Sequence, residues 1–321
     1  MRTIQTETRF PLSSVKPLET LSRYRARCME ETRRILSQGS SRRTVSPVTG
    51  SPLQPFGSVD SFEYLICPDT GSLFLASLPP AAAWAGLLKE MHRVRHSPGG
   101  FHSELAASRG THVYQPKVEW IQETSALQGI RKPALLEVGN APGDLQELLS
   151  RSGSFSRVEF ADETALAHGG FPAGKGAFQA VVLLESLDRS DDPVRLLEGA
   201  QSCLSKGGLL FVTALVASGF DFQALGTNNR YFYPPDRTNC FTLKGLRRLL
   251  EKFKLELVEV STPGVLDVEI VRAHLIQDPS LPISRFERAI ALSDEAVQQA
   301  FQSFLQEKGF SSYARLAARK P

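Results

Sequence analysis

The residues best suited to hold a cofactor follow a short apolar segment near the middle of the chain. Residues 134–138 (ALLEV) predict a buried strand, and a Gly-x-Ala-x-Gly turn from Gly139 to Gly143 leads directly into a helix. Such a turn brings backbone N–H groups close to a ligand, and glycine is needed where a Cβ would collide with it. A dinucleotide fingerprint would place a third small residue at position 144, where this chain has Asp144. Because an acid in the first helical turn would repel a phosphate, a pyrophosphate site is disfavoured.

The turn resembles the first motif of class I S-adenosylmethionine-dependent methyltransferases, in which a hydrophobic strand precedes acidic-x-Gly-x-Gly-x-Gly. Residues 137–143 read EVGNAPG, with alanine in place of the middle glycine. Later segments follow the order of that family through residue 275, and SSYARLAARKP resembles its terminal strand. The matching segments are RVEF at 157–160, FQAVVLLESLDR at 178–189, Asp192-Pro193, Lys206-Gly207-Gly208 and Phe241-Thr242-Leu243.

The resemblance implies how S-adenosylmethionine would be held. Glu137 would help to hold its ammonium group. Glu159, twenty residues after Gly139, would bind the ribose hydroxyls at the end of the second strand. Leu184 and Glu185 would lie under the cofactor, although Glu185 could equally be a surface carboxylate. The turn residues that would wrap the methionine part are Gly139, Asn140, Ala141 and Gly143.

The positions of the catalytic residues depart from the family's pattern, because relatives often carry Glu-His after the fourth strand. The matching positions here are Asp188 and Arg189. A general base is needed only if the acceptor must lose a proton, and histidine is the side chain most able to move one near neutral pH. Either Asp188 acts, or another residue does, or catalysis is weak.

An aromatic insertion, TNNRYFYPPDRTN, supplies candidate substrate-binding residues in Tyr231, Tyr233 and Arg237. Aromatic rings and a guanidinium can stack on and clamp an anionic or ring-bearing small molecule. The alternative is a loop packed by its own aromatic side chains.

The N-terminal part carries a second resemblance, to a zinc ribbon with two Cys-x-x-Cys-Gly knuckles. Residues 46–51 (SPVTGS) and 67–72 (CPDTGS) match the two knuckles with three of the four cysteines replaced. Hydroxyl side chains are poor zinc ligands, so we expect a ribbon-shaped fold without zinc. Packing should hold it together through Phe62, Tyr64, Leu65, Leu73 and Phe74.

Other candidate metal ligands have simpler explanations. His92 and His96 have helical i, i+4 spacing but no nearby acidic or cysteine partner, which favours a solvated basic helix face. The cysteines are far apart in the sequence and favour buried, reduced thiols. They are Cys28, Cys67, Cys203 and Cys240.

The elements that must position these residues alternate between strand-like and helix-like segments, which is typical of α/β folds. We expect a Rossmann-like, mostly parallel sheet with helices on both faces, plus a small N-terminal β-rich head. The expected organisation is a basic helical or flexible segment (1–44), a ribbon-like head with a linking helix (45–98), and a methyltransferase-like domain (99–321). Any third strand between Phe160 and Ala180 must be rudimentary. Helices are expected at 193–205, after Asp192, and at 243–253, after Thr242.

Composition limits the function classes. The chain has 321 residues and a net charge of +3, too small to imply nucleic-acid binding. No apolar run is long enough for a membrane span, and the first residues lack the apolar region of a secretory signal. We therefore expect a cytoplasmic protein that acts on a small molecule, with no prediction of oligomeric state. Two alternatives remain: a catalytically degenerate methyltransferase-like binding protein and a nicotinamide-dependent oxidoreductase.

Overall fold

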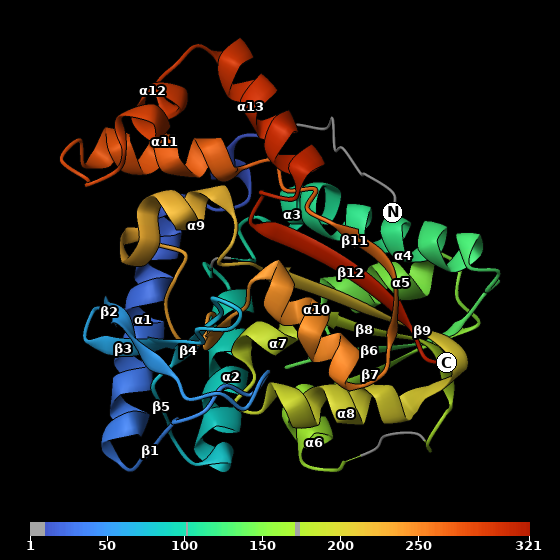
Figure 1. The fold of residues 1–321 in the computed structure, drawn as a ribbon. Helices are drawn as coiled ribbons and strands as arrows, with labels where there is room; N and C mark the ends of the chain where they lie inside the picture. Colours follow the sequence, from blue (N-terminus) through green and yellow to red (C-terminus); the bar gives the residue numbers. More distant parts are fainter. Residues whose placement is uncertain (1–9, 101, 171–173) are drawn as a thin grey trace.

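A six-stranded sheet forms the centre of the protein, with strand order β11-β12-β9-β8-β6-β7 (Figure 1). The computed structural model describes residues 10–100, 102–170 and 174–321. Four neighbouring strands are parallel, and β12 runs antiparallel between β9 and β11. The strands are β6 (Ala134–Gly139), β7 (Arg157–Asp162), β8 (Phe178–Leu184), β9 (Leu204–Leu215), β11 (Glu256–Ser261) and β12 (Tyr313–Arg319). The predicted mostly parallel α/β sheet is confirmed.

Helices cover both faces of this sheet because its central strands are apolar on both sides. Ala180 and Val182 of β8 pack in the cluster that contains α4 and α5. Val181 and Leu183, which point to the opposite face, pack in the cluster that contains α6, α7, α8 and α10. The helices are α4 (Gln115–Leu127), α5 (Asp144–Arg151), α6 (Glu163–Ala167), α7 (Ser186–Arg189), α8 (Pro193–Cys203) and α10 (Leu243–Lys252).

Two helix starts follow the capping signals in the sequence. The Asp192 side chain accepts a hydrogen bond from the Arg195 backbone N–H at 3.0 Å, and Thr242 does the same for Gly245 at 3.0 Å. α8 ends at Cys203, two residues earlier than predicted, because the chain enters β9 at Leu204. That entry is fixed by pairing with β8, which local sequence does not reveal.

The sheet ends at β7. Of the residues between β7 and β8, the structure describes 163–170 and 174–177, and these contain α6 but no strand. Pro172 lies outside the described residues. The third strand that we expected to be rudimentary is therefore absent from the described part of this connection.

A second, antiparallel sheet forms the head, with order β10-β4-β3-β2. Its edge strand β10 comes from beyond the aromatic insertion, so the head and the α/β part share one sheet. All five predicted head residues are buried, and the Tyr64 hydroxyl donates to the Arg237 carbonyl at 2.8 Å. The elements of this region are α1 (Leu18–Ser37), β1 (Ser41–Arg42), β2 (Gln54–Val59), β3 (Phe62–Ile66), β4 (Leu73–Leu75), β5 (Ser77–Leu78), α2 (Ala81–His96) and β10 (Asn239–Cys240).

The remaining elements lie around the ends of the central strands, with α11, α12 and α13 forming a helical layer at the top of Figure 1. None of the helices in the described residues has both the length and the hydrophobicity to cross a membrane. These elements are η1 (Leu12–Ser14), α3 (Ala106–Arg109), η2 (Gly110–Tyr114), α9 (Phe220–Leu225), η3 (Gly226–Asn228), α11 (Asp267–Gln277), α12 (Arg285–Ala291) and α13 (Glu295–Lys308).

Candidate active site

A cavity of about 780 Å³, called the central cavity below, opens where β8 and β9 end. In open α/β sheets, ligands bind beyond the carboxyl ends of the strands, which is where this cavity lies. Glu185 follows β8 and Leu215 ends β9 at its floor. The other lining residues lie within 10–21, 95–123, 231–237, 263–270 and 312–315.

The turn after β6 has open space and unpartnered polar atoms. A Cβ built on Gly143 would meet no atom within 4 Å, and one on Gly139 would meet only the Phe160 ring at 3.6 Å. Glu137 Oε2 and Asn140 Oδ1 are buried without a hydrogen-bond partner in the described residues. Buried polar atoms are nearly always hydrogen-bonded, so these two fit a ligand that supplies donors at this turn.

Glu137 is suited to a cationic ligand group. Burial raises the pKa of its carboxyl to about 8, and Lys117 opposes this only in part. The side chain therefore keeps its proton at neutral pH unless another cation lies beside it. The ammonium group of S-adenosylmethionine is such a cation, so the residues at this turn fit the cofactor.

The acid at the end of the second strand is Asp162, and the prediction that this strand ends at Phe160, with Glu159 as its terminal acid, was wrong. β7 continues to Asp162, which pairs in register with Gly139, whereas Glu159 pairs with Leu136. The half-exposed Glu159 carboxylate lies 3.3 Å from the Arg157 guanidinium. A capping signal was available, because Asp162 precedes the helical ETALA and caps α6 through the Thr164 and Ala165 N–H groups.

Helix α2 lies beside the end of β7, and its two histidines are half-buried and not on the solvated face that we expected. Lys89 Nζ lies 3.1 Å from Asp162 Oδ2. The His92 and His96 rings stack with centroids 4.1 Å apart, and His96 Nε2 lies 3.0 Å from Nδ1 of His102. Burial lowers the pKa of all three imidazoles, that of His92 to about 4, so they are neutral at physiological pH.

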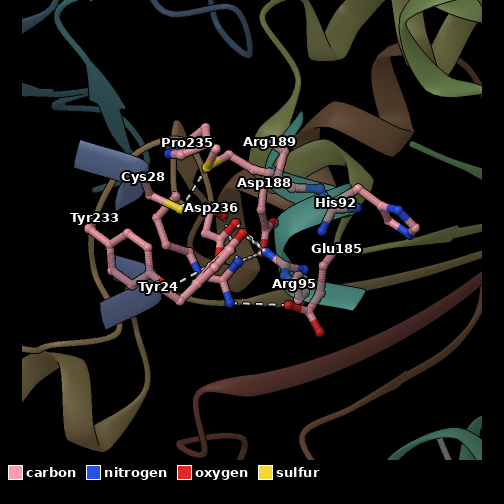
Figure 2. Close-up of polar contacts among 12 residues, drawn as sticks. Tyr24, Cys28, His92, Arg95, Glu185, Asp188, Arg189, Tyr233, Pro235 and Asp236 are labelled. Carbon is pink, nitrogen blue, oxygen red and sulfur yellow. Dashed lines mark hydrogen bonds and ion pairs between the residues drawn. The ribbon is translucent and has the colours of Figure 1, made fainter. Parts of the chain in front are cut away.

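Glu185 and Asp188 lie near each other after β8 (Figure 2), and both carboxylates contact Arg237. Glu185 Oε2 accepts from Arg237 at 3.1 Å, and Oε1 lies 3.6 Å from Lys117 Nζ. Burial alone would raise the pKa of Glu185, but Lys117 and Arg237 lower it well below its usual value. Glu185 is therefore a charged residue in the wall of the cavity and not a freely exposed surface carboxylate.

Neither of the predicted catalytic residues lines the central cavity. Asp188 is fully buried, accepts from the Leu215 backbone N–H at 3.0 Å, and lies 3.4 Å from Arg237. Burial raises its pKa to about 7, opposed by Arg237. The Arg189 guanidinium lies 3.5 Å from the buried carboxylate of Glu163, away from the cavity. Asp188 can therefore position Arg237, but its geometry does not bring it to a bound substrate.

The predicted substrate-binding residues Tyr231, Tyr233 and Arg237 all line the central cavity. Tyr233 is also held by its loop, since its hydroxyl donates to Asp236 at 3.1 Å. Of the remaining predicted cofactor residues, Ala141 is half-buried in the turn. Leu184 packs against the α4–α5 cluster at the end of β8.

Sequence reasoning missed four residues that line this cavity, namely Lys16, His102, Lys117 and Arg315. They come from the N-terminal segment, the residues before α3, α4 and β12. No local spacing links these positions, because only the tertiary fold brings them to the ends of β8 and β9.

Comparisons with known proteins find a methyltransferase domain in this chain. Residues 110–260 match a family model described as a methyltransferase domain. The 1,6-didemethyltoxoflavin-N1-methyltransferase of Burkholderia thailandensis, solved with its substrate and S-adenosylhomocysteine, is 12% identical, with 83% of this chain and 99% of that chain covered and a TM-score of 0.43. Phosphoethanolamine N-methyltransferase 2 of Haemonchus contortus, solved with S-adenosyl-L-methionine, is 14% identical, with 78% of this chain and 63% of that chain covered and a TM-score of 0.42. No curated protein shows a significant match. By this match, residues 110–260 of the chain form a methyltransferase domain.

Proposed function

We propose that the enzyme methylates a small molecule held in the central cavity, with the cofactor bound at the turn after β6. The observation that carries this proposal is the pair of buried, unpartnered atoms at the turn, Glu137 Oε2 and Asn140 Oδ1. Lys117 links the two sites, because it contacts Glu185 in the cavity wall and acts on the charge of Glu137. S-adenosylmethionine, when bound, supplies an electrophilic methyl group, and alignment of the acceptor would provide much of the rate acceleration.

In this proposal, each residue at the turn contacts a different part of the cofactor. Glu137 faces the ammonium group, and Asn140 with the backbone from Gly139 to Gly143 contacts the methionine part. Asp162, in register with Gly139, takes the ribose hydroxyls in place of Glu159. The Asp162 carboxylate is ready to accept hydrogen bonds, since the hydrogen bonds at the α6 cap and Lys89 hold its pKa below the usual value against burial.

His102 is the best-placed group to accept a proton from an acceptor. It lines the central cavity and is only 6% exposed. Burial lowers its pKa, so the ring is unprotonated at pH 7 and has a nitrogen lone pair that can accept a proton. Its Nδ1 lies 3.0 Å from His96 Nε2 and 3.4 Å from the Tyr114 hydroxyl, which could carry the proton onward. His102 would thus do the work of the histidine that is absent after β8.

Binding of S-adenosylhomocysteine tests the cofactor site. We expect calorimetry to show binding by the parent enzyme and a loss of about 10- to 100-fold in affinity for Asp162→Asn, the usual range for a lost charged hydrogen bond. Asparagine keeps the helix cap, so the fold should survive. The matched control is Glu159→Gln, which should stay within about threefold of the parent because Glu159 lies in mid-strand.

The outcomes separate the alternatives. Equal losses in Asp162→Asn and Glu159→Gln would contradict the assignment of Asp162. NADH binding without S-adenosylhomocysteine binding would favour a nicotinamide-dependent oxidoreductase. Cofactor binding with no methyl transfer to any tested small molecule would favour a catalytically degenerate binding protein.

We also propose that the head is a zinc ribbon that has lost its metal ligands. Burial alone would raise the pKa of the Cys67 thiol, but side-chain hydrogen bonds with Ser46, Thr49 and Thr70 lower it. The Thr49 hydroxyl lies 3.5 Å from Cys67 Sγ. The four positions that carry cysteine in the resembled knuckles thus converge on one point, where hydroxyl groups surround a single thiol.

Restoring the cysteines should restore metal binding. We expect the triple variant Ser46→Cys/Thr49→Cys/Thr70→Cys to hold one zinc ion per chain in elemental analysis, since four thiolates make a closed tetrahedral site. Adding Cys67→Ser to the triple variant should weaken zinc retention. A folded triple variant without zinc, or stoichiometric zinc in the parent, would refute the proposal.

A further inference from the structure

Three of the carboxylates that line the central cavity are already engaged by protein groups. Glu185 faces both Lys117 and Arg237, at 3.6 and 3.1 Å. Asp236 lies 2.7 Å from the Arg95 guanidinium. Asp267 accepts from the Ser311 hydroxyl and the Ser312 N–H, each at 2.6 Å. These acids do not remain available to balance further cations in the cavity.

Two cations of the cavity have aromatic neighbours in place of a carboxylate. Lys16 Nζ lies 4.3 Å from the centroid of the Tyr231 ring, and burial lowers its pKa to about 8. The Arg315 guanidinium lies 5.4 Å from the Trp120 ring and 5.6 Å from the Tyr313 ring. Within the parts of the chain that the structure describes, neither cation has an acidic group at ion-pair distance. Burying a cation in this way is costly unless an anion joins it.

Hydrogen-bond donors in the same walls also lack acceptors. The Tyr231 and Tyr313 hydroxyls and the Nε atoms of Arg237 and Arg315 are buried without a hydrogen-bond partner in the described residues. Tyr231 is 7% exposed, and Arg237 and Arg315 are each 8% exposed. A guanidinium Nε can only donate, so a ligand that satisfies this set must be rich in acceptor oxygens.

We propose that the central cavity selects a ring-bearing small molecule with an anionic oxygen group, a carboxylate or a phosphate. Arg315 and Lys16 face the anion, and the rings of Tyr231 and Trp120 provide flat apolar surface for the ring of the ligand. That this molecule is the methyl acceptor rests on the proposed function, whereas its binding does not. The N-terminal segment that contains Lys16 lines one side of the cavity, so we expect this segment to take part in binding the ligand.

Matched probes test the charge requirement. We would titrate the protein, with and without S-adenosylhomocysteine, with 4-hydroxybenzoate, 4-hydroxybenzamide and phenyl phosphate, using calorimetry and tryptophan fluorescence. We expect at least one anion to bind about tenfold or more tightly than the neutral amide, as for a desolvated charge interaction. The preferred anion identifies the carboxylate or the phosphate as the recognised group.

Charge-removing variants locate the interaction. Arg315→Gln and Lys16→Gln should each lower anion affinity about tenfold and leave amide affinity unchanged. Arg272→Gln is the matched control, because Arg272 is exposed on α11 outside the cavity lining. If Arg315→Gln fails to fold, as judged by thermal melting, Lys16→Gln still tests the proposal.

The possible results distinguish the two proposals. If S-adenosylhomocysteine does not bind but the anions do and lose affinity in both variants, the methyltransfer proposal fails and this one stands. If S-adenosylhomocysteine binds and the anions bind no better than the amide, or not at all at about 10 mM, which is weaker than a specific small-molecule site should be, this inference is overturned. Equal losses in the Arg272→Gln control would overturn it as well.

Discussion

Arg237→Met should lower the free energy of unfolding by about 3–5 kcal/mol, the usual cost of leaving a buried charge without its partner. The Arg237 side chain is 8% exposed and lies 3.1 Å from Glu185 and 3.4 Å from Asp188. Methionine can fill most of the same volume, so the loss would report charge and not a cavity. Urea unfolding of parent and variant at pH 7.5 would measure it.

The loss should also depend on pH, with a definite sign. The pKa of Asp188 is already raised to about 7, above its value in an unfolded chain, and removal of Arg237 would raise it further. A group with a raised folded pKa contributes stability that is complete below its unfolded pKa and is lost as the pH rises through its folded pKa. Arg237→Met should therefore be more harmful at pH 8.5 than at pH 6.

A second substitution provides the control. Asp188→Asn combined with Arg237→Met should recover part of the lost stability, because it removes the buried carboxylate whose ion pair is with Arg237, whereas Glu185 keeps Lys117. Arg272→Met, on the exposed face of α11, should change stability by less than about 0.5 kcal/mol. A stable Arg237→Met variant, or a double variant no better than the single one, would show that these charges are solvated.

Local sequence was sufficient where a feature depends on neighbours along the chain. The strand and turn at residues 134–143 follow from an apolar run and small residues. The starts of α8 and α10 follow from Asp192 and Thr242, whose side chains bond to N–H groups three residues ahead. The aromatic insertion supplies three residues of the cavity lining, because Tyr231, Tyr233 and Arg237 lie within one short loop.

Local sequence failed where pairing between distant segments decides the outcome. β7 runs on to Asp162 because it stays in register with β6 as far as Gly139, and nothing in RVEF announces that length. β10 joins the head sheet by pairing with Leu73 and Phe74, more than 160 residues earlier in the chain. Lys16 and Arg315 meet in one cavity for the same reason, since each is carried there by an element whose position depends on the whole fold.

The affinity for S-adenosylhomocysteine should rise as the pH increases from 6 to 8. The Glu137 carboxyl, with a pKa of about 8, is protonated over most of this range in the free enzyme. An ammonium group beside it would favour the carboxylate, so binding must release a proton. One proton released per binding event gives up to tenfold in affinity per pH unit where Glu137 is protonated, and about 50-fold from pH 6 to 8, because the free carboxyl is half ionised at pH 8.

Neighbouring groups should not obscure this dependence. Burial lowers the pKa of His92 to about 4, so this imidazole stays neutral between pH 6 and 8, and burial also lowers the pKa of His96 and His102. The pKa of Asp162 is lowered as well, so its carboxylate stays charged throughout. Calorimetry in two buffers of different ionisation enthalpy would count the released protons directly.

Glu137→Gln separates the role of this carboxyl in binding from its role in folding. The variant should bind more weakly than the parent at pH 8, and its affinity should be flat from pH 6 to 8. For the free parent enzyme the sign is opposite: the raised pKa of Glu137 favours the folded state below pH 4.5, and this contribution is lost as the pH rises through 8. Stability should thus fall over the range in which affinity rises. In Glu137→Gln the slope of the affinity should vanish and the slope of the stability should decrease, with the remainder coming from groups such as Asp188. If the parent's affinity is flat or falls from pH 6 to 8, Glu137 does not face the ammonium group of the cofactor.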